Sequence, residues 1–312
     1  MFTARKGRLV ALGAVVVGAA IALSGCASSN PISGGSGSGA KTTLVVGSQD
    51  YYSNEIIAEI YAQALENGGF TIDRQFKIGQ REVYLPELKS GKIDVFPEYI
   101  GSLDQALNKS LNKTAPGGSA DAVAKNLASV LPTGLRALDK AKAADQNSWT
   151  VTSEFAKKYN LSDIASLKNV TEPIQVGGNS ELATRPYGPD ALKAKYGITT
   201  AGLTAIEDGG GPLTVKALLD NKIQLANIYT ASPLIKTDNL FVLKDPDNLF
   251  FPDNVAPIVS KKVTTKAADI LNTVNAKLSQ SDLVSLNSQS VTDQKSAPAI
   301  AKEWLTKNNL LK

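Results

Sequence analysis

The sequence predicts an α/β protein built from two similar lobes, and two observations carry this prediction. The chain repeats itself weakly at an offset of 130 residues, which aligns segment 88–102 with 218–232 and places Tyr99 on Tyr229. The same offset places Gly47 on Gly177, and each glycine ends a short apolar run. Each copy is therefore expected to hold a strand, a glycine turn, a helix and, 52 residues after the glycine, a strand that delivers a tyrosine.

Residues 1–25 have the pattern of an export signal. Three basic residues between positions 5 and 8 precede an uncharged run of 15 residues at 9–23, which is shorter than the roughly 20 residues that a membrane-spanning helix needs. The segment ends in Leu-Ser-Gly-Cys, which resembles a bacterial lipobox and implies cleavage before Cys26 and lipidation of its sulfur. The alternative is a plain secretion signal with a leftover cysteine.

Residues 26–41 are expected to form the lipidated cysteine and a flexible tether, because Ser and Gly dominate them. A flexible chain of this length reaches about 20 Å. Removing the three positive charges of the signal lowers the formal net charge from +4 to +1. The near-neutral charge, and the lack of basic runs interleaved with aromatics, argue against a nucleic-acid partner.

The sequence contains no histidine, and Cys26 is its single cysteine. The commonest general base, the usual zinc ligands and the Ser-His and Cys-His nucleophile pairs are therefore missing. Chemistry based on carboxylates or lysine remains as the enzymatic alternative. We expect a protein that is not an enzyme and that holds no cofactor and no metal.

The first lobe is expected to open with a strand at 43–46. A helix follows at 54–67, where apolar residues recur at helical spacing until Gly68 and Gly69 stop the helix. Residues 48–53 would then lie between a strand's carboxyl end and a helix's amino end, where unpaired N–H groups can face a ligand. The same criteria predict, in order, strand 72–78, helix 81–89, strand 93–96 and helices 100–111 and 121–130.

The chain is expected to cross into the second lobe near 144–151. Trp149 stands there among polar residues, which makes it a candidate binding aromatic; the alternative is a tryptophan that covers a domain edge. The second lobe would then contain helix 153–158, strand 174–176, helices 189–196 and 213–220, and the strand that ends at Tyr229.

The chain would return to the first lobe near 249–259 and add helices at 268–278, 281–288 and 297–308. We therefore assign 42–147 and 253–312 to lobe I and 148–252 to lobe II. The folded part, about 270 residues, is larger than a single hydrophobic core usually supports, which favours a division into two domains. Two crossings between discontinuous α/β domains imply a hinge and a cleft between facing strand-end loops.

Several segments are similar to the substrate-binding proteins of ABC importers for glycine betaine, choline and related osmoprotectants, and the resemblance covers nearly all of 42–312. It is carried by Val46-Gly47-Ser48 with the following helix, by 91–102 (GKIDVFPEYIGS), by 181–186 (ELATRP), by 208–213 and by 251–259. The resemblance implies a type II periplasmic-binding-protein-like fold that closes on a small quaternary amine. It also implies ABC permease partners with a cytoplasmic ATPase, and a place on the outer face of the cell membrane.

The resemblance further implies a cage of aromatic rings, whose faces attract a cation that has no N–H group to donate. Tyr99, Tyr229 and Trp149 match the cage walls, and Arg185 resembles the arginine that pairs with the carboxylate of betaine. The polar positions that complete the ligand shell are matched by Ser102, Gln49 and Asn147.

Two positions depart from the family pattern. Gln49 stands where some relatives have lysine, which weakens the case for a carboxylate ligand, and Asp253 stands where some have a fourth tyrosine. An anionic wall at Asp253 would suit choline better than a zwitterion. Three alternatives remain open: Arg185 bridges Glu181 one helical turn back, Tyr99 and Tyr229 are core residues, or the ligand is another small polar solute such as an amino acid.

Overall fold

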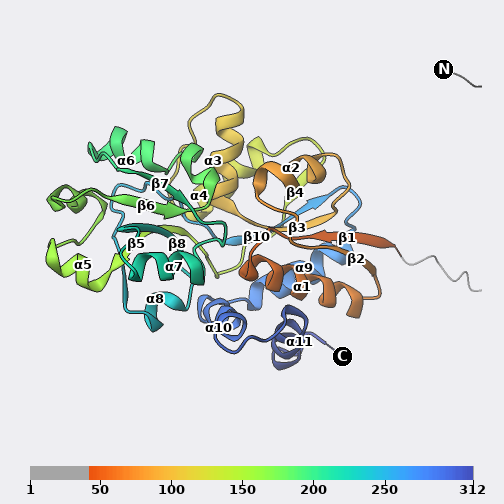
Figure 1. The fold of residues 1–312 in the computed structure, drawn as a ribbon. Helices are drawn as coiled ribbons and strands as arrows, with labels where there is room; N and C mark the ends of the chain where they lie inside the picture. Colours follow the sequence, from red (N-terminus) through yellow and green to blue (C-terminus); the bar gives the residue numbers. More distant parts are fainter. Residues whose placement is uncertain (1–41, 312) are drawn as a thin grey trace, which may run out of the picture. The chain divides into compact units, whose positions relative to one another are not determined.

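The computed structural model describes residues 42–311; the predicted signal peptide, Cys26 and tether lie outside this range. The described chain contains two five-stranded mixed sheets, each covered by helices (Figure 1). The first has the order β2-β1-β3-β10-β4 and the second β7-β6-β8-β5-β9. Because β6, β7 and β8 occupy the places of β1, β2 and β3, the two sheets have the same topology, as the sequence repeat predicts.

The strands of the first sheet are β1 (Thr43–Gly47), β2 (Thr71–Gln75), β3 (Val95–Tyr99), β4 (Leu135–Ala137) and β10 (Val255–Ser260). Those of the second are β5 (Asn147–Thr152), β6 (Gln175–Gly178), β7 (Gly202–Ala205), β8 (Leu225–Tyr229) and β9 (Leu240–Val242). In the first sheet β1 pairs in parallel with β2 and β3, and β10 pairs antiparallel with β3 and β4. The second sheet repeats this with β6, β8 and β5.

Helices cover both faces of the first sheet. They are α1 (Tyr52–Asn67), α2 (Arg81–Lys89), α3 (Ile100–Ser110), α4 (Ala120–Val130), α9 (Thr265–Lys277), α10 (Gln280–Val291) and α11 (Ala297–Lys307). Side chains of β10 alternate between the two cores: Val255 and Val259 pack with α1 and α9, whereas Ala256 and Ile258 pack with α3 and α4. This alternation is the period of a strand that is buried on both faces.

The second sheet is covered in the same way. Its helices are α5 (Ser153–Lys158), α6 (Pro189–Tyr196), α7 (Pro212–Leu219) and α8 (Leu234–Thr237), with the 3-10 helices η1 (Ile164–Asn169) and η2 (Ser180–Thr184). One core contains Trp149 and Leu225, and the other contains Ala226 and Ile228. We call the first sheet with its helices lobe I and the second lobe II.

The two segments that cross between the lobes lie side by side. Ala144 forms an antiparallel bridge with Asn254, and the Asp145 N–H donates to the Asp253 carbonyl at 3.1 Å. The chain leaves the first sheet after Ala137 and enters the second at Asn147. It leaves the second sheet after Val242 and returns to the first at Val255. The finer boundaries, 42–147 with 253–312 and 148–252, stay a proposal; β5 begins at Asn147, so in the structure this residue belongs to the second sheet.

Two kinds of element differ from the sequence prediction. Strand β3 runs over Val95–Tyr99 instead of 93–96, so it continues through Pro97, which lies opposite Pro257 of β10. Five strands were not predicted. Strands β5 and β10 lie in segments that were predicted only as crossings between the lobes, and β4, β7 and β9 each have three or four residues and lie at a sheet edge. Within residues 42–311 no helix combines the length and apolar character needed to cross a membrane.

Candidate ligand-binding site

A small cavity between the lobes is lined by side chains from both of them. Seven of the residues predicted from the sequence line it: Gln49, Tyr99, Ser102, Asn147, Arg185, Tyr229 and Asp253. Its volume is about 30 Å³, room for no more than a few water molecules. A larger ligand can therefore enter only if the surrounding side chains separate.

Three tyrosine rings, contributed by both lobes, meet at this cavity. Tyr99 ends β3 of lobe I, Tyr229 ends β8 of lobe II, and Tyr51 precedes α1. The centroid of the Tyr51 ring lies 5.3 Å from that of Tyr229 and 6.4 Å from that of Tyr99. Burial raises the pKa of all three phenols, so the rings are neutral and present their faces as weakly negative surfaces.

The position of Trp149 corrects the predicted third wall. Its side chain is 0% exposed in the core of lobe II and does not line the cavity. The ring packs 6.1 Å from Phe250, which in turn packs 5.3 Å from Tyr187 at the cavity wall. Strand β5 presents Asn147 to the cavity, but Trp149 lies two residues further into the lobe. Its aromatic contacts connect it to the cavity through Phe250 and Tyr187.

Six further residues line the cavity that sequence reasoning did not assign: Tyr51, Gln80, Arg81, Asp145, Glu181 and Tyr187. Two of them lie in stretches singled out for other reasons, Tyr51 in the 48–53 loop and Asp145 beside the predicted crossing. Tyr187 follows Arg185 by two positions. The loop position was the available signal for these three, but only the packed structure shows which side chains turn inward.

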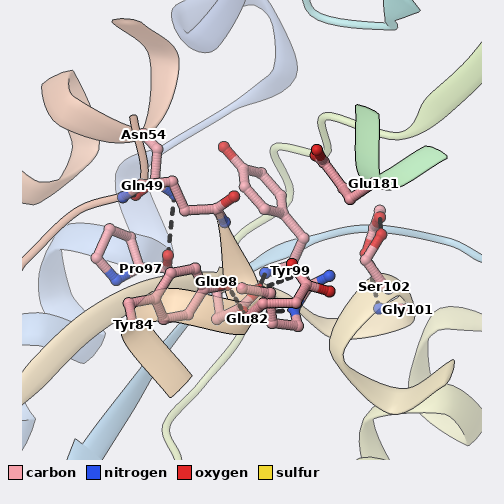
Figure 2. A network of polar contacts seen from close by, with 12 residues as sticks. Gln49, Asn54, Glu82, Tyr84, Pro97, Glu98, Tyr99, Gly101, Ser102 and Glu181 are labelled. Atoms are coloured by element: carbon pink, nitrogen blue, oxygen red, sulfur yellow. Dashed lines mark hydrogen bonds and ion pairs between the residues drawn. The ribbon is translucent and has the colours of Figure 1, made fainter. Parts of the chain in front are cut away.

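A buried ion pair supports the wall formed by Tyr99. Arg81 donates from Nε and Nη2 to the two carboxylate oxygens of Glu98, both at 2.9 Å, and both side chains are at least nine-tenths buried. Glu98 also accepts hydrogen bonds from the Tyr84 hydroxyl and from the backbone N–H of Tyr99 (Figure 2). The pair therefore fixes the backbone from which the Tyr99 ring projects.

Arg185 lines the cavity but is paired with another residue of the protein. Its two terminal nitrogens donate to the Glu82 carboxylate of lobe I at 2.6 and 3.1 Å, whereas Glu181 is 3.9 Å away. The predicted alternative, a bridge to Glu181, is therefore the weaker of its two contacts. The bidentate pair with Glu82 joins lobe II to lobe I.

Asp253 is held at the amino end of α3. Its carboxylate accepts hydrogen bonds from the backbone N–H groups of Gly101 and Ser102, at 2.7 and 2.8 Å, and from the Ser102 hydroxyl. Asn147 of lobe II in turn donates to that hydroxyl at 3.2 Å. Gly101 is needed here because a Cβ would lie 2.6 Å from the Pro252 carbonyl. Burial raises the pKa of Asp253 to about 6, and the hydrogen bonds from Ser102 at the start of α3 partly oppose this rise.

Gln49 is positioned by the start of α1. Its backbone N–H donates to Asn54 at 2.8 Å, and the Asn54 amide donates to the Pro97 carbonyl at 2.9 Å (Figure 2). This links the loop after β1 to the end of β3, so that Gln49 and Tyr99 share one wall. In the described part of the chain, no group of acidic, histidine or cysteine side chains could hold a metal ion.

Asp145 is an acidic side chain of the same cavity wall as the three rings. It is 3% exposed, and its Oδ1 accepts a hydrogen bond from the Ala231 N–H at 2.8 Å. Its charge acts on Tyr51, Tyr99 and Tyr229. Burial raises the pKa of Asp145 to about 7, and the neighbouring Asp253 adds to the rise.

The comparison with protein families decides the class of this protein. Residues 42–307 match the model of the substrate-binding domain of ABC-type glycine betaine transport systems. The chain belongs to this family. This glycine betaine-type binding domain is therefore the substrate-binding component of an ABC transporter, an extracytoplasmic protein with two lobes.

Individual relatives of this binding domain are distant. The carnitine transport binding protein OpuCC of Listeria monocytogenes is 23% identical over 88% of this chain and 90% of its own length. The ergothioneine transport permease/ergothioneine binding protein EgtU of Helicobacter pylori is 26% identical over 86% of this chain, which spans 48% of that protein. A crystal structure of a glycine betaine/carnitine/choline ABC transporter protein has the same fold, with a TM-score of 0.68 at 20% identity over 86% of this chain and all of that one.

Proposed function

We propose that this protein captures a small quaternary ammonium compound, such as glycine betaine, choline or carnitine, between its lobes. The observation that carries the proposal is the meeting of Tyr51, Tyr99 and Tyr229, from both lobes, at one small cavity. A methylated ammonium group has no N–H to donate, so ring faces supply its main attraction. Gln49, Ser102, Asn147 and Asp253 complete the proposed shell, and Arg185 faces the polar end of the ligand.

The family supports a role in delivery as well as in capture. We propose that the closed, loaded protein presents the ligand to the permease of an ABC importer with a cytoplasmic ATPase, without chemical change. Cys26, with the tether that follows it, is proposed to carry the lipid that anchors the protein on the outer face of the cell membrane. Mass spectrometry of protein from a membrane fraction would detect the lipid, and a Cys26→Ser variant should release the protein.

The proposal is tested by calorimetric titration of the mature chain with glycine betaine, choline, carnitine and proline. At least one trimethylammonium compound is expected to bind with a 1:1 stoichiometry, and proline is expected to bind more weakly. Recovery of the ligand unchanged after prolonged incubation would agree with a role without turnover. The proposal is wrong if an amino acid with a free amine binds and every trimethylammonium compound fails.

The ion pair between Arg185 and Glu82 is expected to act as a latch that favours the closed state. Replacing Glu82 with Gln removes the charge of a half-exposed side chain, so the affinity for ligand should fall by no more than about fivefold. High salt should weaken binding to the unmodified protein more than binding to the variant, because salt screens this pair. The measurement is a titration at two salt concentrations. Equal salt dependence in the two proteins would argue against a latch.

A further inference from the structure

The cavity wall carries more acid than base. Arg81 and Arg185 are its two cationic side chains, whereas Asp145, Glu181 and Asp253 are acidic. Both arginines are already paired, with Glu98 and with Glu82. No free guanidinium is therefore left in the wall for the carboxylate of a ligand, and the surplus charge of the wall is negative.

Asp145 is a buried acid of the cavity wall without a countercharge. In residues 42–311 no lysine or arginine forms an ion pair with it. Asp253, by comparison, receives three hydrogen bonds from the start of α3. Burying an unpaired carboxylate costs several kcal/mol, and a bound cation would offset that cost.

Several buried hydroxyls without a hydrogen bond of normal geometry lie on segments that interact with Asp145. The hydroxyls of Tyr99 and Ser53 are buried and make no hydrogen bond in the described part of the chain, and neither does that of Ser232, which follows Ala231. Ser53 lies close enough to Asp145 to lower its pKa, although it makes no hydrogen bond of normal geometry. Native proteins rarely leave such groups without partners, so their position points to a polar or charged guest.

We propose that Asp145 is the countercharge for the ammonium group of the ligand, so that the site selects net cations such as choline over zwitterions such as glycine betaine. This inference rests on the proposed function and adds the ligand's charge class to it. The tyrosine rings contact the methyl groups, and Asp145 neutralises the charge from the hinge side, where the two crossing segments pair. The carboxylate of a zwitterion would instead meet Glu181 and Asp253 without a free cation to receive it.

The groups that face Asp145 fix the expected pH dependence. They are Tyr51 and Tyr52 at the start of α1, Tyr99 at the end of β3, Tyr229 at the end of β8, and Asp253 on the second crossing segment. The pKa of every one of these tyrosines is raised, so they stay neutral. In the free protein Asp145 takes up a proton as the pH falls through about 7, and cation binding must expel that proton. Affinity for choline should therefore fall by up to about tenfold per pH unit below this value.

The test compares the unmodified protein with Asp145→Asn by titration with choline and with glycine betaine. Asparagine keeps an oxygen that can accept from Ala231, and replaces the other carboxylate oxygen with an uncharged NH2 group. We expect choline to bind the unmodified protein more tightly than glycine betaine, and Asp145→Asn to weaken choline binding by at least about 30-fold. Glycine betaine binding should change much less, and the pH dependence near 7 should disappear in the variant.

The matched control is Asp104→Asn. Asp104 is also a buried acid of lobe I whose burial raises its pKa, but it bonds to Asn108 and Asn126 and does not line the cavity. This variant should bind choline as the unmodified protein does. Folding is checked by thermal unfolding without ligand. Asp145→Asn should be at least as stable as the unmodified protein above pH 7, because a raised carboxylate pKa means that ionisation costs stability there.

The outcomes separate the two proposals. If no quaternary amine binds the unmodified protein, the proposed function fails and the role of Asp145 fails with it. If choline binds but the folded Asp145→Asn variant binds it within about threefold of the unmodified protein, only the inference about Asp145 is wrong. Tighter binding of glycine betaine than of choline would also overturn it.

Discussion

Replacing Arg81 with methionine is expected to lower the free energy of unfolding by about 3–5 kcal/mol. The loss is large because the variant leaves the Glu98 carboxylate, 1% exposed, without its cation in the interior of lobe I. Whole domains are stable by only about 5–15 kcal/mol, so the variant should unfold at a clearly lower denaturant concentration. Chemical denaturation followed by circular dichroism measures the change.

Two variants control this experiment. Removing Glu98 together with Arg81, as Arg81→Met with Glu98→Met, should recover part of the loss, because no buried charge is then left unpaired. Lys158→Met breaks a solvent-exposed pair with Glu172 and should leave the unfolding midpoint unchanged. A loss below about 1 kcal/mol for Arg81→Met would mean that water reaches Glu98 and that the pair is not structurally important.

Replacing Tyr229 with leucine is expected to weaken binding of a quaternary ammonium ligand by roughly 10- to 30-fold, since a desolvated cation over one ring gains up to about 2 kcal/mol. Tyr229 is chosen because its ring comes from lobe II and packs on Tyr51 of lobe I. The loss of affinity is therefore expected for a cationic ligand, on which the two lobes close. Titration with choline and with its uncharged carbon isostere separates the electrostatic part from packing, because the isostere should lose far less affinity.

Trp149→Phe is the matched control for the ring experiment. Trp149 lies in the core of lobe II behind Phe250, so this variant should change stability within the common range of about 0.5–3 kcal/mol. Its ligand affinity should stay within about threefold of the unmodified protein. If Trp149→Phe weakened binding as much as Tyr229→Leu, the conclusion that Tyr229 contacts the ligand and Trp149 does not would be wrong.

Local patterns predicted some helices to the residue. The helices at 81–89, 153–158 and 189–196 begin and end where the sequence indicated, because apolar spacing and end residues such as Pro189 and Gly197 act within one or two turns. Strand β3 was misplaced because Pro97 reads as a strand end. In the structure Pro97 lies opposite Pro257 of β10, a partner more than 150 residues away that no local pattern can reveal.

The binding site likewise combines features that the sequence predicted with features that depend on contacts between remote residues. Seven of the eight predicted binding residues line the cavity. The repeat accounts for Tyr99 and Tyr229, which it places at equivalent strand ends of the two lobes, and the family resemblance supplied the other five. Trp149 was assigned wrongly because a polar neighbourhood in sequence suggested exposure. Strand β5 and the aromatic layer of Phe250 and Tyr187 bury it instead. The partner of Arg185 was likewise missed, because Glu82 belongs to the other lobe.

The sequence by itself determined the class of fold, the two-lobed repeat, the family and the positions of most cavity residues. The fold class and the repeat follow from apolar periodicity, glycine turns and their spacing along the chain, whereas the family and most predicted cavity residues follow from the resemblance of several motifs to known binding proteins. Only the tertiary structure decided which charges are paired. Arg81 and Arg185 find Glu98 and Glu82, while Asp145 is buried among tyrosines without a cation. Pairing depends on distance and burial, which arise only when the two crossing segments bring remote parts of the chain together.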